Sequence, residues 1–148
     1  MIPALTVRQP WATAFFTRPA DLAKDVENRT WSVSYRGPLA IHAGQQLDER
    51  GVDYLCTEGG ERGAVLGLVE LVDCHVAGSD RCSDWGCEEN PWAFFPPPLG
   101  LPRGQRLVHW RVEHPREFVT PIPARGAVGL WTPGPSLVGL LELSEVLL

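Results

Sequence analysis

The sequence predicts an α+β fold, a small mixed β-barrel with flanking helices. Its 148 residues and 16.3 kDa suit one domain, residues 1–148, large enough to bury a core without metals or disulfides. The 15 glycines and 14 prolines indicate many turns between short strands. Short runs with strand character are interrupted by helical segments, an alternation typical of α+β barrels rather than of helical bundles.

Strands and helices alternate in the first half of the chain. Pro10 suits the first turn of a helix, in which Trp11, Ala14 and Phe15 share one face. A glycine pair at 59–60 ends this half. The elements expected here, in chain order, are a strand at 4–7, the helix from Pro10, strands at 25–31 and 38–43, and a helix at 47–55.

The second half begins with the strongest strand pattern in the sequence. Residues 64–75 are rich in Val and Leu, and Gly67 within them indicates a bend or bulge. Residues 90–106 include three consecutive prolines and are expected to form a surface loop. The elements expected after this loop are strands at 107–113, 118–122 and 127–131, and a final helix at 135–148.

Charge is unevenly distributed along the chain. The formal net charge is −5, yet residues 1–42 carry five basic and three acidic residues. Because counterion release needs clustered Lys and Arg, we expect a locally positive site on an acidic body and no long basic face for a duplex. The sequence contains no glycine-rich phosphate loop, His-Glu-x-x-His helix or Gly-x-Ser-x-Gly elbow. These absences exclude the common nucleotide hydrolases, zinc proteases and serine esterases.

The N-terminal residues lack a basic region followed by an apolar core, and no apolar stretch is long enough to cross a bilayer. We therefore expect a cytoplasmic protein without membrane association.

The cysteines are Cys56, Cys74, Cys82 and Cys87. In a reducing compartment we expect free thiols, with no disulfide, no metal and no cofactor. The spacing of the last three, with His75, is not that of a standard zinc ribbon. Four soft ligands in a loop-rich stretch nevertheless leave zinc binding open.

Ordered motifs cover nearly the whole chain and begin with Leu-Thr-Val-Arg-Gln-Pro-Trp-Ala at 5–12. Further motifs follow at 24–31, 35–39, 41–43, 67–74 and 121–131. In this order and spacing they resemble the ASCH family, a branch of the PUA-like superfamily, and in particular a small stand-alone ASCH protein of bacterial or phage type. The resemblance implies a PUA-like barrel. Lys24, Glu27 and Arg29 match the family pattern Gly-x-Lys-x-x-Glu-x-Arg, with Leu22 in place of the glycine.

The residues of this motif suit one cleft. Side chains alternate along a strand, so Asp25, Glu27 and Arg29 share one face, and Lys24 can turn toward the same groove from the strand's start. An amine, a carboxylate and a guanidinium together can bind a phosphate, orient a base edge or transfer a proton. The structural alternative is a salt-bridge network that closes the barrel.

Aromatic and polar side chains near this motif complete the candidate site. Trp11 and Trp31 offer ring faces for an unstacked base, although core packing is the alternative for each. Gln9 offers a donor and an acceptor for a base edge, or caps a turn. Arg29 and Arg36 are candidates for contact with phosphate.

The leading functional hypothesis is a module that binds RNA, another single-stranded nucleic acid or a nucleoside-like small molecule. The alternative implied by the resemblance is an amidohydrolase that acts on acylated nucleosides such as acetylcytidine, with Lys24 matching the family's lysine. Glu27 stands where that mechanism has a threonine, so Thr30 or Thr6 would have to replace it. A variant is ribonuclease-like cleavage, with Glu27 as base and Lys24 stabilising charge.

A third hypothesis is a domain that binds a protein partner without chemistry. Its basis is the acidic stretch 43–102, with three basic and eleven acidic residues, which is otherwise a solvated face.

Overall fold

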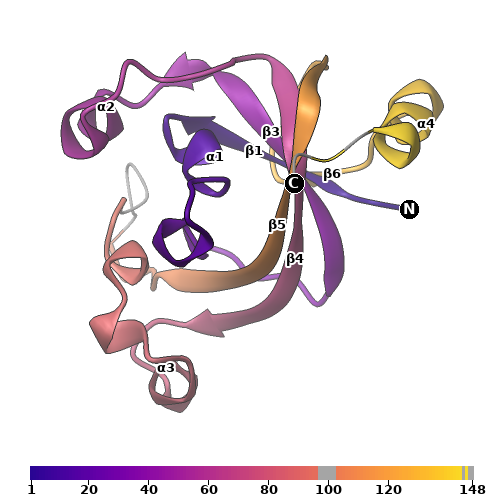
Figure 1. Ribbon diagram of the computed structural model, residues 1–148. Coiled ribbons are helices and arrows are strands. Elements are labelled where there is room, and N and C mark those ends of the chain that lie inside the picture. Colours follow the sequence, from indigo (N-terminus) through magenta and orange to yellow (C-terminus); the bar gives the residue numbers. More distant parts are fainter. Residues whose placement is uncertain (97–102, 145, 147–148) are drawn as a thin grey trace.

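The computed structural model describes residues 1–96, 103–144 and 146. One six-stranded sheet curls around a short helix, with further helices outside it (Figure 1). The strands are β1 (Ala4–Gln9), β2 (Val26–Arg29), β3 (Gly37–Leu47), β4 (Ala64–Val76), β5 (Val108–Pro123) and β6 (Leu130–Trp131). The α-helices are α1 (Trp11–Ala14), α2 (Glu49–Leu55), α3 (Asp80–Trp85) and α4 (Pro135–Leu143), and the 3-10 helices are η1 (Ala20–Leu22), η2 (Cys87–Glu89) and η3 (Pro91–Ala93).

The sheet is mixed and open. Its strand order is β2-β5-β4-β3-β1-β6, in which β1 and β3 are parallel and the other pairs are antiparallel. β2 and β6 therefore lie at the two edges, and the sheet forms a half-barrel rather than a closed one. This architecture confirms the α+β class and the barrel-like sheet with flanking helices that the sequence predicts.

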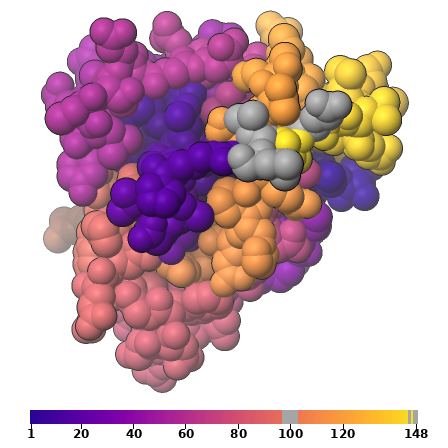
Figure 2. Space-filling view, viewed as in Figure 1, coloured from indigo at the N-terminus to yellow at the C-terminus, as the bar shows by residue number. Residues whose placement is uncertain are grey.

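Alternation along the strands produces a core on each face of the sheet. On the concave face, Leu5, Ile41 and Val69 pack with Trp11 and Phe15 of the α1 segment. On the other face, a smaller cluster joins the strands to α4, which stands at the side of the body (yellow in Figure 2). That cluster consists of Ala4, Ala40, Val65, Leu68, Phe118, Ile122 and Leu141. Neighbouring strand residues such as Ala4 and Leu5 thus supply side chains to opposite cores.

Gly67 lies at a bulge, as the sequence predicts. The β4–β5 register shifts between Val65 and Gly67. A Cβ at Gly67 would lie 2.9 Å from the Cα of Glu117 and would also meet the carbonyl of Arg116. Only glycine therefore allows β5 to cross this closely over β4.

The two strands expected at 107–113 and 118–122 form one continuous strand, β5, so the expected break is wrong. His114 takes a positive φ of 51° and the β4–β5 register shifts nearby, so the chain bends within the ladder instead of leaving it. The sequence pattern also did not predict α3. This helix begins directly after Ser79 and ends before Gly86, whose φ is 66°.

Other boundaries differ by a few residues. The strand expected at 127–131 is reduced to β6, and the final helix ends at Leu143 rather than at 148. The expected surface loop contains η3, while its residues 97–102 lie outside the described part of the chain. No helix within the described ranges is both long and apolar enough to cross a membrane.

Candidate functional site

A groove with a volume of about 780 Å³ opens between β1, β2, the start of α2 and the segment before β6. β1 contributes Thr6 and Arg8, whose side chains alternate with those of Leu5 and Val7 in the core. β2 and the residues after it contribute the centre of the candidate site. The groove is lined by Thr6, Val7, Arg8, Trp11, Glu27, Asn28, Arg29, Thr30, Trp31, Gly44, Gln45, Gln46, Asp48, Arg50, Pro96, Gln105, Ala127, Val128 and Gly129.

The structure brings Lys24, Glu27 and Arg29 together. Oε1 of Glu27 lies 3.2 Å from Nζ of Lys24. Oε2 of Glu27 accepts from Nε and Nη2 of Arg29 at 2.9 and 2.6 Å. Nη2 of Arg29 also donates to the backbone carbonyl of Thr6 at 3.0 Å. Glu27 therefore uses both oxygens to hold two cations, and it fixes the guanidinium of Arg29 at the groove.

Lys24 lies behind this pair and does not line the groove. Its side chain is fully buried, its ammonium donates to the carbonyl of Val26, and it stands 5.1 Å from the ring centre of Phe15. Burial lowers the pKa of Lys24 below its usual value, although the charge of Glu27 acts in the opposite direction. Lys24 lines a separate cavity of about 490 Å³, together with Asp25.

Glu27 is held in its ionised form. Burial acts to raise the pKa of Glu27, but the charges and hydrogen bonds of Arg29 and Lys24 outweigh it, so the pKa lies below the usual value of 4.5. A carboxylate with both oxygens engaged and a lowered pKa is a poor proton acceptor. Its evident role in this geometry is to orient Arg29.

A second acid–base pair, Asp48 and Arg50, also lines the groove. Asp48 caps α2 by accepting from the backbone N–H of Arg50, and its carboxylate also accepts from Nη2 of Arg50 at 2.7 Å. The indole N–H of Trp11 donates to Asp48 at 3.0 Å. The hydrogen bond from Arg50 is the largest influence on the pKa of Asp48 and holds it below the usual value of 3.8. Sequence reasoning missed this pair; its one signal was an Asp at the start of an expected helix.

The two tryptophans of the candidate site differ in exposure. Trp11 is only 2% exposed and packs edge-on against Phe95, with ring centres 5.2 Å apart. Trp31 is half-buried and stands edge-on against Trp110, with ring centres 4.7 Å apart. Trp11 is therefore a buried wall of the groove, whereas Trp31 packs against the core and also lines the groove in a half-buried position.

Gln9 and Arg36 lie outside the residues that line the groove. Gln9 is completely buried and donates to the hydroxyl of Thr13 at 2.8 Å and to the carbonyl of Glu61 at 2.6 Å. Arg36 donates to the carbonyls of Val33 and Tyr35 on the surface. The structure does not bring these two candidates to the site.

Thr6 and His42 form a hydroxyl–imidazole pair beside Arg29. Nε2 of His42 lies 2.7 Å from the carbonyl of Ala124, so that nitrogen carries the proton and Nδ1 is free to accept. Oγ1 of Thr6 lies 3.1 Å from Nδ1 of His42 and accepts from the indole of Trp131 at 3.0 Å. Both residues belong to motifs that the sequence shows, but only the parallel β1–β3 register places Thr6 opposite His42.

No protein-family model and no curated protein matches the sequence. Solved structures do match it. The crystal structure of ASCH from Zymomonas mobilis aligns with a TM-score of 0.60 and 13% identity, over 97% of this chain and 95% of that chain. A point mutant of the Zymomonas mobilis protein aligns with a TM-score of 0.58 and 14% identity, over 97% of this chain and 98% of that chain. The chain has the ASCH fold. The fold expected from the sequence motifs is thus confirmed.

In this ASCH fold the groove is locally positive. Arg8, Arg29 and Arg50 line it, and its two acids, Glu27 and Asp48, are each paired with one of these arginines. Lys24 adds a further positive charge behind Glu27. The net charge of the whole chain is −5, so the groove stands out against an acidic body.

One other group of side chains in this ASCH fold consists of residue types that can bind a metal ion. His75, Cys82, Cys87 and His109 are all buried, and their donor atoms lie within 4.8 Å of one another. Within residues 1–96, 103–144 and 146, no other group of three or more His, Cys, Asp and Glu side chains is arranged to hold a metal ion. None of the four lines the groove.

Proposed function

We propose that the groove binds single-stranded RNA or a nucleoside-like ligand. The observation that carries this proposal is that a half-buried tryptophan, Trp31, lines the groove together with three arginines, Arg8, Arg29 and Arg50. Base–aromatic stacking contributes about 1–3 kcal/mol per base, and arginines supply the phosphate contacts that stacking lacks.

The size of the groove favours this class of ligand. Pockets for small ligands have volumes of about 300–1,000 Å³, and the groove, at about 780 Å³, falls in that range. A nucleoside or a short single-stranded segment fits such a volume, whereas a duplex needs a longer basic face.

Different lining residues of the groove suit different parts of such a ligand. Arg29, fixed by Glu27, and the exposed Arg8 would contact phosphate. Trp31 would stack on a base. Thr30 and Gln105 offer polar atoms for its edge, because both line the same groove.

The test is fluorescence anisotropy with a labelled single-stranded RNA, titrated at several salt concentrations. Arg8→Gln should weaken binding and reduce the slope of log affinity against log salt by about one. Trp31→Ala should weaken binding by about 1–3 kcal/mol with little change in that slope. Arg36→Gln removes an exposed arginine outside the groove and is the matched control. Equal effects of Arg8→Gln and Arg36→Gln, or no binding by the unaltered protein of either RNA or nucleosides, would contradict the proposal.

A second candidate function is hydrolysis of an acylated nucleoside, favoured by Thr6 and His42. A hydroxyl hydrogen-bonded to an imidazole that is itself oriented by a third group has the geometry of an activated nucleophile. Oγ1 of Thr6 would attack the acyl carbon and pass its proton to His42, which returns it to the leaving amine. Water would then cleave the acyl-threonine. This assignment replaces Lys24 and Glu27, which are engaged with each other and with Arg29.

Mass spectrometry of acylated nucleosides incubated with the protein separates the two functions. Turnover that is lost in Thr6→Val and His42→Gln, but kept in Thr30→Val, would support hydrolysis. Retention of ligand without turnover would leave binding as the function of the groove.

A further inference from the structure

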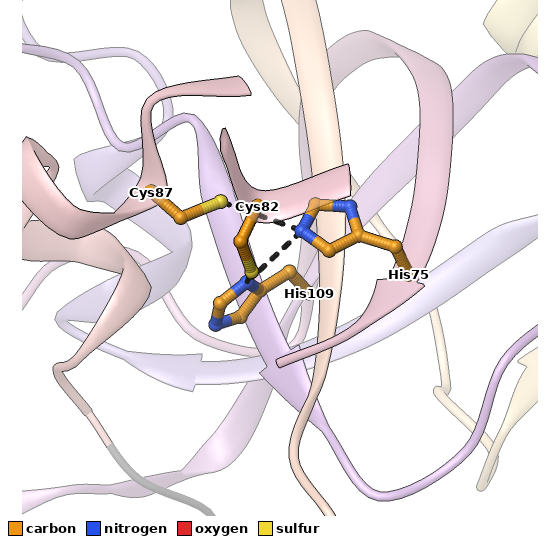
Figure 3. A group of neighbouring side chains, drawn as sticks. All are labelled: His75, Cys82, Cys87 and His109. Carbon is orange, nitrogen blue, oxygen red and sulfur yellow. Dashed lines mark hydrogen bonds between the residues drawn. The ribbon is translucent and has the colours of Figure 1, made fainter. Parts of the chain in front are cut away.

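Four buried side chains meet at the end of β4 and β5, away from the lining of the groove. His75 comes from β4 and His109 faces it from β5, because the two residues are partners in the ladder. Cys82 lies on α3 and Cys87 begins η2. Figure 3 shows the four side chains pointing toward one another. Each is at most 8% exposed.

Their spacing matches a tetrahedral ion site. Nε2 of His75 lies 3.2 Å from Nδ1 of His109 and 3.3 Å from Sγ of Cys87. Sγ of Cys82 lies 3.6 Å from Nδ1 of His109. A tetrahedron with Zn–N bonds of about 2.0–2.1 Å and Zn–S bonds of about 2.3 Å has ligand–ligand edges of roughly 3.3–3.8 Å. These three distances are thus close to the edges of such a tetrahedron, and all four donor atoms lie within 4.8 Å of one another.

Hydrogen bonds on the outer side of each imidazole fix its tautomer. Nδ1 of His75 lies 2.8 Å from a carboxylate oxygen of Asp73, which only accepts, so Nδ1 carries the proton. Nε2 of His109 lies 3.1 Å from the carbonyl of Ala93, so Nε2 carries the proton there. The two nitrogens that face each other at 3.2 Å therefore both present lone pairs. Two acceptors at this distance repel, and a cation between them removes the repulsion.

We propose that His75, Cys82, Cys87 and His109 bind one Zn²⁺ as a structural site. Two imidazole nitrogens and two sulfurs in tetrahedral arrangement are the ligands that zinc prefers. Two thiolates and two neutral imidazoles neutralise the dication, so the buried site has no net charge. All four positions are filled by protein, which is the mark of a structural rather than a catalytic zinc.

Asp73 completes the arrangement. It is buried, accepts from His75, and pairs with Arg81 of α3. A carboxylate on the outer nitrogen of a histidine is the usual second partner in zinc sites, because it orients the ring and raises the basicity of the ligating nitrogen. Arg81 in turn draws α3, which carries Cys82, toward β4.

The zinc would fasten a segment that reaches the groove to the strands of the sheet. Residues 80–96 (salmon in Figure 2) form one end of the molecule, and Cys82 and Cys87 would fasten them to β4 and β5. The last part of this segment reaches the groove, because Nδ2 of Asn28 donates to the carbonyls of Trp92 and Pro96 at 2.9 and 3.3 Å. Pro96 lines the groove.

The proposal departs from the sequence expectation of free thiols without metal. The zinc alternative that the sequence left open counted Cys74 as a ligand, but Cys74 alternates with His75 along β4 and packs against the concave core. His109 lies 34 residues from His75 and becomes a neighbour only through the β4–β5 register.

The first experiment measures zinc in the purified full chain by inductively coupled plasma mass spectrometry, after incubation with one equivalent of Zn²⁺ and desalting. We expect about one Zn²⁺ per chain. Cys82→Ser and Cys87→Ser should each lower retained zinc at least tenfold. Cys74→Ser and Cys56→Ser, matched thiol removals outside the cluster, should retain it. Zinc absent from the unaltered protein, or lost equally from Cys74→Ser, would overturn the proposal.

Cobalt supplies a second readout that does not depend on the folding of a variant. The unaltered protein, freed of metal and loaded with Co²⁺, should show the intense visible bands of a tetrahedral ion and a near-ultraviolet thiolate band. Addition of Zn²⁺ should abolish them. A weak octahedral spectrum without the thiolate band would overturn the site.

Discussion

Arg29 joins two strands that do not pair with each other. Its guanidinium is held by Glu27 on β2 and donates to the carbonyl of Thr6 on β1. β2 is an edge of the sheet and its ladder partner is β5, whereas β1 lies between β3 and β6. Arg29 therefore bridges the opening of the half-barrel, and the charged cluster serves both the architecture and the groove.

Removal of the Glu27 charge should destabilise the protein strongly. Glu27→Gln leaves Lys24 buried without its counter-charge, and loss of one partner from a buried ion pair costs about 3–5 kcal/mol. Urea denaturation followed by tryptophan fluorescence measures the loss. The control is Glu70→Gln, which removes a partly exposed partner 3.8 Å from Arg116 and should cost no more than about 1 kcal/mol. Similar costs for the two variants would contradict the assigned role of the cluster.

Stability should fall in acid, and Glu27 and Asp48 contribute to this dependence. Their pKa values in the folded protein lie below the usual 4.5 and 3.8, so the unfolded chain takes up protons at higher pH than the folded one. The stabilisation is complete above about pH 4.5 and is lost as pH falls toward the folded pKa values. Thermal unfolding at successive pH values measures it. Glu27→Gln should flatten the acid branch, and an unchanged acid branch would refute the coupling.

Gly67 should not tolerate a methyl group. Its added Cβ would meet backbone atoms of β5, which cannot move aside as a flexible side chain can, and we expect Gly67→Ala to cost roughly 1–3 kcal/mol. Gly139→Ala is the matched change, because nothing lies within 4 Å of its Cβ and it stands inside α4. There alanine should stabilise by about 0.5–1 kcal/mol. Chemical denaturation should give opposite signs, and two losses of equal size would count against the close strand crossing.

Two substitutions at Asp48 should separate the effect of its helix cap from the effects of its other interactions. The cap and the indole of Trp11 use different oxygens of Asp48, so Asp48→Asn keeps one acceptor, enough for the cap of α2, while Asp48→Ala removes both. We expect a loss of about 1–2 kcal/mol for alanine and a smaller loss for asparagine. Differential scanning calorimetry gives the order. An equal loss for both would mean that the charge facing Arg50 and the hydrogen bond from Trp11 matter more than the cap.

Much of the fold is predictable from the sequence because its motifs are local. Strand alternation alone puts Glu27 and Arg29 on one face, and the folded chain brings their side chains together. The same alternation contains a signal that the sequence prediction did not use: Gln9 has the parity of Leu5 and Val7, which fill the concave core, so its burial follows from the strand itself.

The parts of the fold and of the site that the sequence did not predict depend on contacts between segments far apart in the chain. Asp48 reaches Trp11 only because β3 returns beside β1, and His109 reaches His75 only through the β4–β5 register. Neither pairing register can be predicted from one strand alone, since a shift of one residue moves every side chain of a strand to the opposite face of the sheet. The bend of β5 at His114 likewise depends on the surface it crosses, and its sequence suggested a break.

The pairing of β2 with β5 affects the order in which the strands can pair during translation. A ribosome delivers β1, β3 and β4 in succession, and each can pair soon after it emerges. Residues 26–29, however, wait for residues 108–111, their ladder partners, through most of translation. Nascent chains released before that point would carry much of the scaffold and an incomplete groove. The groove is therefore completed late in synthesis, and any ligand that it binds would distinguish finished molecules from truncated ones.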